Sequence, residues 1–227
     1  MERYVFLGVL LFTIVALGVG MMIPGKETSE ADLYMPWQIE RSVEGKTRVF
    51  GLELGVSTLT EAQRRFHELY EVSMFVREDG VKVVEAFFDS VTLSGLRARV
   101  VVVLDLTPEQ LDGLYDRGVR ISKLESGGRK VMVNDADLPG LASTPIASLT
   151  YIPRSHLKAD MVETRFGRPS ERIRETGGDE VVEHWLYPHY GLDLALHEKG
   201  KEVLQYVQTD RFELLRKPLL EAGERVK

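Results

Sequence analysis

The sequence contains no cysteine. Disulfide bonds, thiolate metal sites, a cysteine nucleophile and a lipidated N-terminal cysteine are therefore all excluded, and the redox compartment is left open. A basic stripe is also missing, because the 227 residues carry a formal net charge of −6. Nucleic-acid-binding surfaces are usually basic, so we expect no nucleic acid as a partner.

Signatures of catalysis and of phosphate binding are also lacking. No serine lies in a nucleophile elbow, and no glycine-rich loop of the phosphate-cradling kind is present. Gly127-Gly128 and Gly177-Gly178 instead separate short apolar runs and predict hairpin turns. We therefore predict no catalytic residue, no cofactor and no enzymatic activity. A pocket with two carboxylates, or a histidine with a strongly shifted pKa, would argue for an enzyme.

Three histidines are clustered in the C-terminal half of the chain. His184, His189 and His197 lie within 14 residues, with Asp193 between them. Zinc requires three or four converging ligands. In an extended strand the side chains alternate between two sides, and neither side collects all three histidines. We therefore predict no metal site.

One long hydrophobic run lies near the N-terminus. The 20 residues from Tyr4 to Ile23 carry no charge, and about 20 helical residues span the roughly 30 Å core of a bilayer. A cleaved signal peptide is the alternative, although its apolar region is typically about 7–15 residues long. We predict a retained transmembrane signal anchor over residues 1–23. Arg3 precedes the run and acidic residues follow it, which predicts an inner-membrane protein with a cytoplasmic N-terminus and a periplasmic C-terminal domain.

Turn residues divide the rest of the chain. Residues 24–47 are predicted to be a linker, because Pro24 ends the hydrophobic run. Residues 48–145 and 146–215 each contain an amphipathic helical pattern followed by a hairpin and an alternating strand, which predicts two α+β modules. Residues 216–227 mix charges without periodicity and predict a flexible tail.

Two stretches repeat one pattern 98 residues apart. Residues 82–90 read KVVEAFFDS, and residues 180–188 read EVVEHWLYP. Phe66 likewise matches Phe166 at an offset of 100. Insertions collect in loops, so a drifting offset is what a duplicated module predicts. Coincidence among residues that are common in strands is the alternative interpretation.

The connections between the predicted strands are short. Short connections predict antiparallel sheets, and one helix per module is expected to cover one face of each sheet. The predicted fold class is therefore α+β, with an N-terminal transmembrane helix followed by two tandem helix-plus-antiparallel-sheet modules.

Residues 157–169 and the segments that follow them carry a resemblance to a known family. They read LKADMVETRFGRP, a predicted amphipathic helix ended by Phe-Gly-x-Pro, and HWLYP and GLDLAL follow. This pattern resembles the BamE-like (SmpA/OmlA-like) periplasmic envelope modules, and the tandem arrangement is similar to the β-lactamase-inhibitor fold. The resemblance covers residues 155–208 best, since the first copy has His67-Glu68 where the motif has Gly-x-Pro. It implies a non-enzymatic module that binds other envelope components.

The face of each predicted sheet away from its helix is the predicted binding surface. Aromatic and arginine side chains are enriched at protein interfaces. Strand alternation, with the aromatic side as the open one, assigns seven partner-binding residues: Phe87, Arg97, Arg99, Trp185, Tyr187, Asp193 and His197. The alternative is that the aromatic residues pack between the modules or under a loop.

The predicted function follows from the anchor and the binding surface. We expect a membrane-anchored periplasmic binding or assembly factor that contacts an envelope protein. The alternative is a small-molecule or lipid-binding module in the cleft between the repeats. A cavity lined by Val83, Val101 and Leu186 would indicate a lipid, and a flat exposed aromatic patch would indicate a protein.

Overall fold

A computed structural model describes residues 34–125, 127–177 and 180–226 of the chain. The chain divides into two units, Met1–Leu33 and Tyr34–Lys227, and all the described residues belong to the second. The predicted membrane span from Tyr4 to Ile23 and the first part of the predicted linker lie outside the described residues.

The part of the chain that the structure describes holds no helix that is long and apolar enough to cross a membrane. The predicted transmembrane helix and the predicted inner-membrane location, with its cytoplasmic N-terminus and periplasmic domain, therefore find no support. We correct both predictions accordingly.

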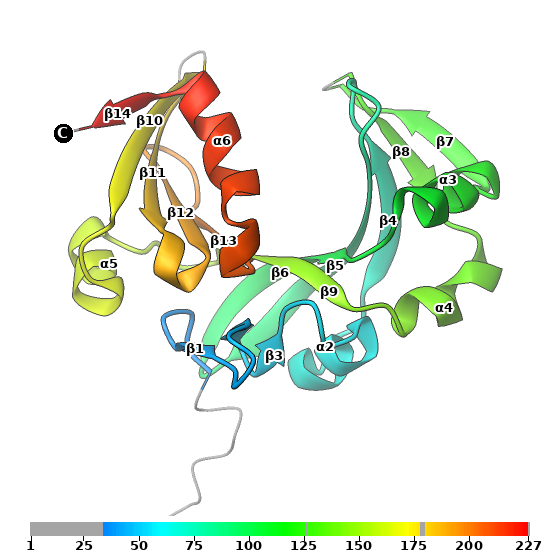
Figure 1. Ribbon diagram of the computed structural model, residues 1–227, viewed down its shortest axis with the longest axis horizontal. Coiled ribbons are helices and arrows are strands. Elements are labelled where there is room, and N and C mark those ends of the chain that lie inside the picture. The colour runs from blue at the N-terminus through cyan, green and yellow to red at the C-terminus, as the bar shows by residue number, and fades with distance from the viewer. Residues whose placement is uncertain (1–33, 126, 178–179, 227) are drawn as a thin grey trace, which may run out of the picture. The chain divides into compact units, whose positions relative to one another are not determined.

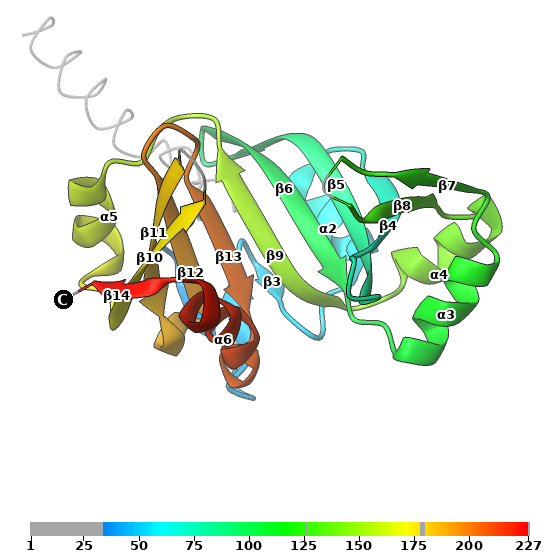
Figure 2. The same cartoon turned by 90° about the horizontal axis from the view of Figure 1, so that it is seen from above.

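Antiparallel sheets make up most of the second unit (Figures 1 and 2). A three-stranded sheet contains β1 (Ile39–Arg41), β2 (Thr47–Val49) and β3 (Leu52–Glu53). An eleven-stranded sheet has the order β14-β10-β11-β12-β13-β9-β6-β5-β4-β8-β7. Its strands along the chain are β4 (Glu71–Val76), β5 (Lys82–Leu93), β6 (Leu96–Leu104), β7 (Arg120–Lys123), β8 (Arg129–Met132), β9 (Ile146–Pro153), β10 (Glu171–Gly177), β11 (Glu180–Tyr187), β12 (Leu192–His197), β13 (Val203–Val207) and β14 (Glu224–Val226).

The helices are short, and side-chain caps set where two of them begin. Thr58 and Thr107 each form a capping box, in which the threonine and the residue three positions later bond to each other's backbone N–H. The helices are α2 (Leu59–Phe66), α3 (Pro108–Asp116), α4 (Leu138–Ala142), α5 (Ala159–Phe166) and α6 (Glu213–Ala222), with the single 3₁₀ turns η2 (Asp135–Asp137), η3 (Pro188–Tyr190) and η4 (Thr209–Arg211).

The predicted α+β class with two separate modules is wrong, because strands from both halves join one sheet. Strand β9 pairs with β6 on one side and with β13 on the other. The molecule is therefore mainly a β structure with helices at its surface, and no sheet boundary falls at residue 146. The sequence prediction missed this because alternation within a strand does not reveal which strand lies beside it.

An order of elements does recur in the two halves. A helix followed by a three-stranded antiparallel meander appears as α2-β4-β5-β6 and again as α5-β10-β11-β12. In the sheet each meander runs inward along the chain, from β4 or β10 to β6 or β12, so the two lie on opposite sides of the central pair β9 and β13. The shared sheet thus combines two similar pieces.

The repeated Val-Val-Glu sequence does not occupy equivalent positions within these two pieces. In β5, Val84 and Phe88 are fully buried in the main core, so Glu85 lies on the opposite face. In β11 the residues buried in that core are Trp185 and Tyr187, on the side of Glu183. A shift of one residue moves every side chain of a strand to the other face. The repeated letters therefore occupy opposite faces in the two halves.

The main core lies on one face of the large sheet, here called the covered face. Val84, Phe88 and Val100 contribute to this core from the first half. The covering elements are α2, α3, α4, α5 and the small sheet, whose buried side chains belong to the same cluster (Figure 1).

The opposite face is covered only over the C-terminal strands. There Ile173, Leu186 and Val207 form a second cluster with Phe212, and Leu215 and Leu219 of α6 pack against it. Residues from 216 onward, where we expected a flexible tail, thus form most of α6 and strand β14.

Candidate functional site

The strands β4, β5, β6 and β9 have one face that no described helix covers. Cross-strand pairing aligns its side chains in rows, such as Phe87 opposite Val101 and Val101 opposite Thr150. The open face is defined by the half-buried residues Ser73, Phe75, Val83, Glu85, Phe87, Val101, Val103, Ser148, Thr150 and Ile152.

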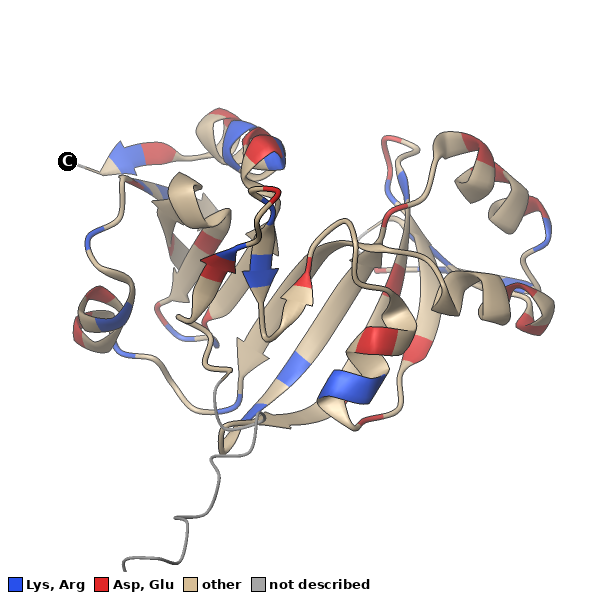
Figure 3. Cartoon of the chain, turned by 60° about the horizontal axis from the view of Figure 1, so that its bottom comes forward, with Lys and Arg blue, Asp and Glu red and all other residues tan. Residues whose placement is uncertain are grey.

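The half-buried residues of the open face are mainly apolar, and the exposed charged residues Glu71 and Arg99 lie on the same side of the sheet, opposite Phe87 and Ile152. None of the six apolar residues of the open face belongs to either buried cluster or to the hydrophobic residues packed against the clusters. The strands at the centre of the sheet also carry few charged residues (Figure 3). A continuous, partly exposed apolar surface on a folded protein is typical of an interaction site.

One carboxylate, Glu85, lies within this apolar surface. Its cross-strand neighbours are Ser73 and Val103. Burial raises the pKa of Glu85 above its ordinary value. Among the described residues, no hydrogen bond or ion pair of Glu85 is found, whereas nearby Asp89 pairs with Arg99 and Arg154. Glu85 therefore has unused bonding capacity toward a molecule on the open face.

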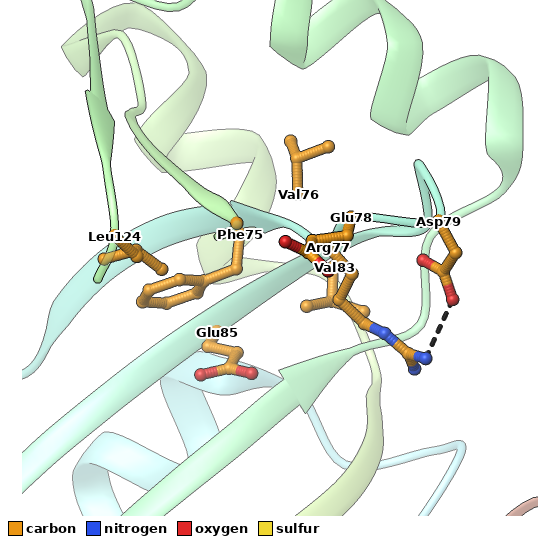
Figure 4. Close-up of a pocket in the computed structure, with 9 residues that line it drawn as sticks. Phe75, Val76, Arg77, Glu78, Asp79, Val83, Glu85 and Leu124 are labelled. Carbon is orange, nitrogen blue, oxygen red and sulfur yellow. Dashed lines mark hydrogen bonds and ion pairs between the residues drawn. The ribbon is translucent and has the colours of Figure 1, made fainter. Parts of the chain in front are cut away.

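A pocket of about 590 Å³ adjoins Glu85 at the hairpin end of β4 and β5 (Figure 4). Phe75, Val83 and Leu124 form its apolar wall, and Glu78 and Glu85 contribute carboxylates. The nearby carboxylate of Asp79 is already paired with Arg77 at 2.8 Å. The pocket thus combines apolar walls with acidic groups, which suits a group that is both cationic and partly apolar.

No family model, curated protein or solved structure matches the chain. The assignment of a function therefore depends on the geometry of the open face.

Three of the seven predicted partner-binding residues lie in strands that form the open face. Phe87 is half-buried on that face, opposite Val101. Arg99 follows the same alternation along β6 as Val101, and its Nε donates to Asp89 Oδ1 at 3.2 Å. Arg97 donates to Ser90 Oγ at 3.3 Å and lies near the turn into β6. Phe87 is therefore the predicted residue that the structure places best for binding.

Trp185 and Tyr187 are not available to a partner, which corrects their assignment. Their exposed fractions are 4% and 0%. Tyr187 contacts the ring of Phe166 from α5 and donates its hydroxyl proton to Gly167 O at 3.0 Å. Trp185 donates to Glu183 Oε1 at 2.8 Å. Both aromatic residues are thus part of the main core on the covered face, where Tyr187 packs against α5, rather than lying between two modules or under a loop.

Asp193 lies on the same side of the sheet as the open face, yet it is only 2% exposed. Both of its carboxylate oxygens lie 3.0 Å from His184 Nδ1, and Glu175 lies 3.5 Å from His184 Nε2. Burial lowers the pKa of His184, but the hydrogen bond and charge of Asp193, with Glu175, outweigh it and raise the pKa overall. His197 is half-buried on the same side of β12, four residues beyond Asp193 and opposite Val182. This cluster serves the interior rather than a docking surface.

The three clustered histidines do not converge in the structure. His189 lies on η3, and its ring contacts that of Tyr190 in a tilted arrangement, with ring centroids 3.9 Å apart. Within the described ranges, no group of three or more histidine, aspartate or glutamate residues is arranged to hold a metal ion.

The sequence prediction missed Phe75 and Glu85 as site residues. The signal was present, because Glu85 lies between apolar residues of a strand in which Val84, Ala86 and Phe88 are the buried side.

Proposed function

We propose that this protein is a non-enzymatic binding protein that holds a protein partner on the open face. The observation that carries the proposal is the apolar surface of β4, β5, β6 and β9, which lies opposite a fully covered face. Partly exposed valine and phenylalanine side chains supply area, and Glu85 supplies a polar contact within that area. The resemblance to BamE-like modules supports a protein partner, because those modules bind other envelope components.

The lipid alternative has less support. Val83 lines the pocket near the hairpin, but Leu186 is fully buried beneath α6, so the three expected residues do not line one cavity. An extended surface with a shallow pocket fits a macromolecule better than a small molecule that must be enclosed.

Acid–base catalysis is a second candidate function, favoured by the two carboxylates of the pocket. Burial raises the pKa of Glu85, as a general acid requires. Glu78, however, is exposed at the hairpin turn, and the pocket is open to solvent. Purified protein that turns over a glycoside or ester, with the activity lost in Glu85→Gln, would replace the binding proposal with this one.

The test is site-specific photo-crosslinking in intact cells. A photoreactive amino acid is placed at Val101 on the open face, and a matched control carries it at the exposed Arg64 of α2 on the covered side. We expect one protein adduct at position 101 that is absent at position 64 and lost when Phe87→Asp is added. An adduct at both positions, or at neither, would count against the open face as the binding surface.

A further inference from the structure

One half of the side of the sheet that carries the open face is already covered by a helix of the chain itself. Pairing runs without interruption from Phe87 through Val101, Thr150, Gln205 and Asp193 to Leu186. Leu186 therefore lies on the same side of the sheet as the open face, but α6 covers it (Figure 2). One half of this side is occupied by a helix, and the other half is unoccupied by any described element.

Helix α6 combines apolar and basic contacts with the sheet. Leu215 and Leu219 pack on the second cluster. Between them, Arg216 donates from Nε to Glu171 Oε2 at 2.8 Å. Glu171 is directly opposite Leu186 in the register, and its side chain is only 18% exposed. Arg225 of β14 also pairs with Glu171, from Nε to Oε1 at 2.7 Å, so an arginine among leucines and a second arginine from a strand together neutralise this half-buried carboxylate.

Glu85 occupies a comparable environment in the other half, without the arginine. It is half-buried among Phe87, Val103 and Phe75, and burial raises the pKa of its carboxyl group. A guanidinium would satisfy two carboxylate oxygens at once, since its planar fork matches their geometry.

The dimensions of the open face also match a helix. Four strands spaced about 4.8 Å apart extend over roughly 15 Å. A helix of ten residues, the length of α6, is about 15 Å long.

Building on the proposed function, we propose that the open face receives an amphipathic helix of a protein partner and that an arginine of this helix binds Glu85. The leucine-type residues of the helix would contact Phe75, Phe87 and Val101, as Leu215 and Leu219 contact the second half. The arginine would take the place at Glu85 that Arg216 takes at Glu171.

The probe is a stapled peptide with the sequence of residues 212–222, whose apolar spacing already fits this side of the sheet. Stapling is needed because isolated helices shorter than about 12–15 residues are marginal in water. A second peptide carries citrulline, which has the shape of arginine without its charge, at the position of Arg216. Binding of both peptides to the full chain is measured by fluorescence anisotropy.

We expect the arginine peptide to bind the wild-type protein about tenfold more tightly than the citrulline peptide. In Glu85→Gln this preference should fall below about twofold, whereas Glu71→Gln, a change at an exposed carboxylate opposite Phe87, should retain it. Carboxyl ¹³C NMR should also show the pKa of Glu85 falling when the arginine peptide binds.

The outcomes separate this inference from the proposed function. Equal binding of the two peptides, or a preference that persists in Glu85→Gln, would overturn the arginine contact. Failure of both peptides to bind, with a protein adduct still formed at Val101, would reject the helix and leave the proposed function standing. A crosslink at Val101 to a second copy of this chain would replace the helix with self-association.

Discussion

At the residue scale, the carboxyl group of Glu85 is expected to reduce stability at neutral pH while serving the proposed binding. Its pKa is raised by burial, so the folded state disfavours the ionised form. A raised carboxyl pKa leaves stability intact at low pH and reduces it as the pH rises above the ordinary value of 4.5. We expect Glu85→Gln to increase the free energy of unfolding at pH 7 by up to about 1 kcal/mol and to have little effect at pH 3. Urea denaturation at the two pH values measures the difference, and a loss of stability at pH 7 would show that Glu85 has an internal partner.

The His184–Asp193 pair gives the same sign of pH dependence at a higher pH, but here the folded state stabilises the charged form of the titrating group. The raised pKa of His184 means that the pair contributes its full stabilisation below the ordinary histidine value of 6.5 and loses it as the pH rises through the folded-state value. We expect Asp193→Asn to lower the free energy of unfolding by about 2 kcal/mol at pH 6, since it removes a buried charged hydrogen bond. The difference in the free energy of unfolding between Asp193→Asn and the wild type should be smaller at pH 9. A difference that is constant with pH would mean that the histidine is neutral throughout.

Sequence alternation separates the two faces correctly in strands that have one buried face. Alternation in β6 separates Val100 and Val102, which are fully buried, from Arg99 and Val101. Strand β11 is buried on both faces at Trp185, Leu186 and Tyr187, because α5 lies near one face and α6 covers the other. A strand buried on both faces reads as a continuous apolar run, so alternation does not reveal its orientation.

At the scale of elements, Gly191 shows how a single position connects η3 to β12. Its φ of +65° is in the left-handed region, and an added Cβ would collide with the carbonyl oxygen of Val207. The same glycine accepts a hydrogen bond from Val207 N at 2.8 Å. We expect Gly191→Ala to lower the free energy of unfolding by about 3 kcal/mol. Gly140→Ala is the control, because a Cβ there meets open space in α4 and is expected to change stability by less than about 1 kcal/mol. Thermal unfolding of both variants checks the contrast.

Helix α6 was missed for a physical reason. Pro218 lies inside it, and proline ordinarily ends a helix because it lacks a backbone donor. Leu215 and Leu219 are one turn apart and pack on the sheet, so tertiary contacts stabilise a helix that local propensity disfavours. By contrast, the helices that Thr58 and Thr107 cap were recognisable, since these capping residues are visible in the sequence.

At the scale of the whole molecule, element order was predictable and assembly was not. Helix and hairpin signals are local, and the hairpin turn predicted at Gly127-Gly128 does connect the antiparallel strands β7 and β8. The pairing of β9 with β13 joins segments about 55 residues apart, and each strand satisfies its own pattern with or without that neighbour. The position of the open face depends on this pairing, so it was visible only in the structure.

The shared sheet predicts that the two halves unfold together. One buried cluster contains side chains from β4, β5 and β6 as well as from β11, β12 and β13, and seven registered pairs join β6 to β9. Separating the halves would expose this core and leave β9 without a partner on one side. We therefore expect one cooperative transition in urea. Far-UV circular dichroism, which reports every strand, and fluorescence of Trp37 and Trp185, which both lie near α5, should give midpoints within about 0.2 M of each other.

Hydrogen exchange provides the decisive control for this prediction, because the two tryptophans report only on the C-terminal half. The amides of β5 and β11 should exchange through openings of equal free energy if the sheet is one cooperative unit. Two independent modules divided near residue 146 would instead show two different free energies of opening in hydrogen exchange and two urea midpoints. In that case the open face would belong to a separately folding first half, and a fragment covering residues 48–153 would be expected to bind the arginine peptide unaided. If the sheet is cooperative, the same fragment loses β13 beside β9 and should neither fold nor bind.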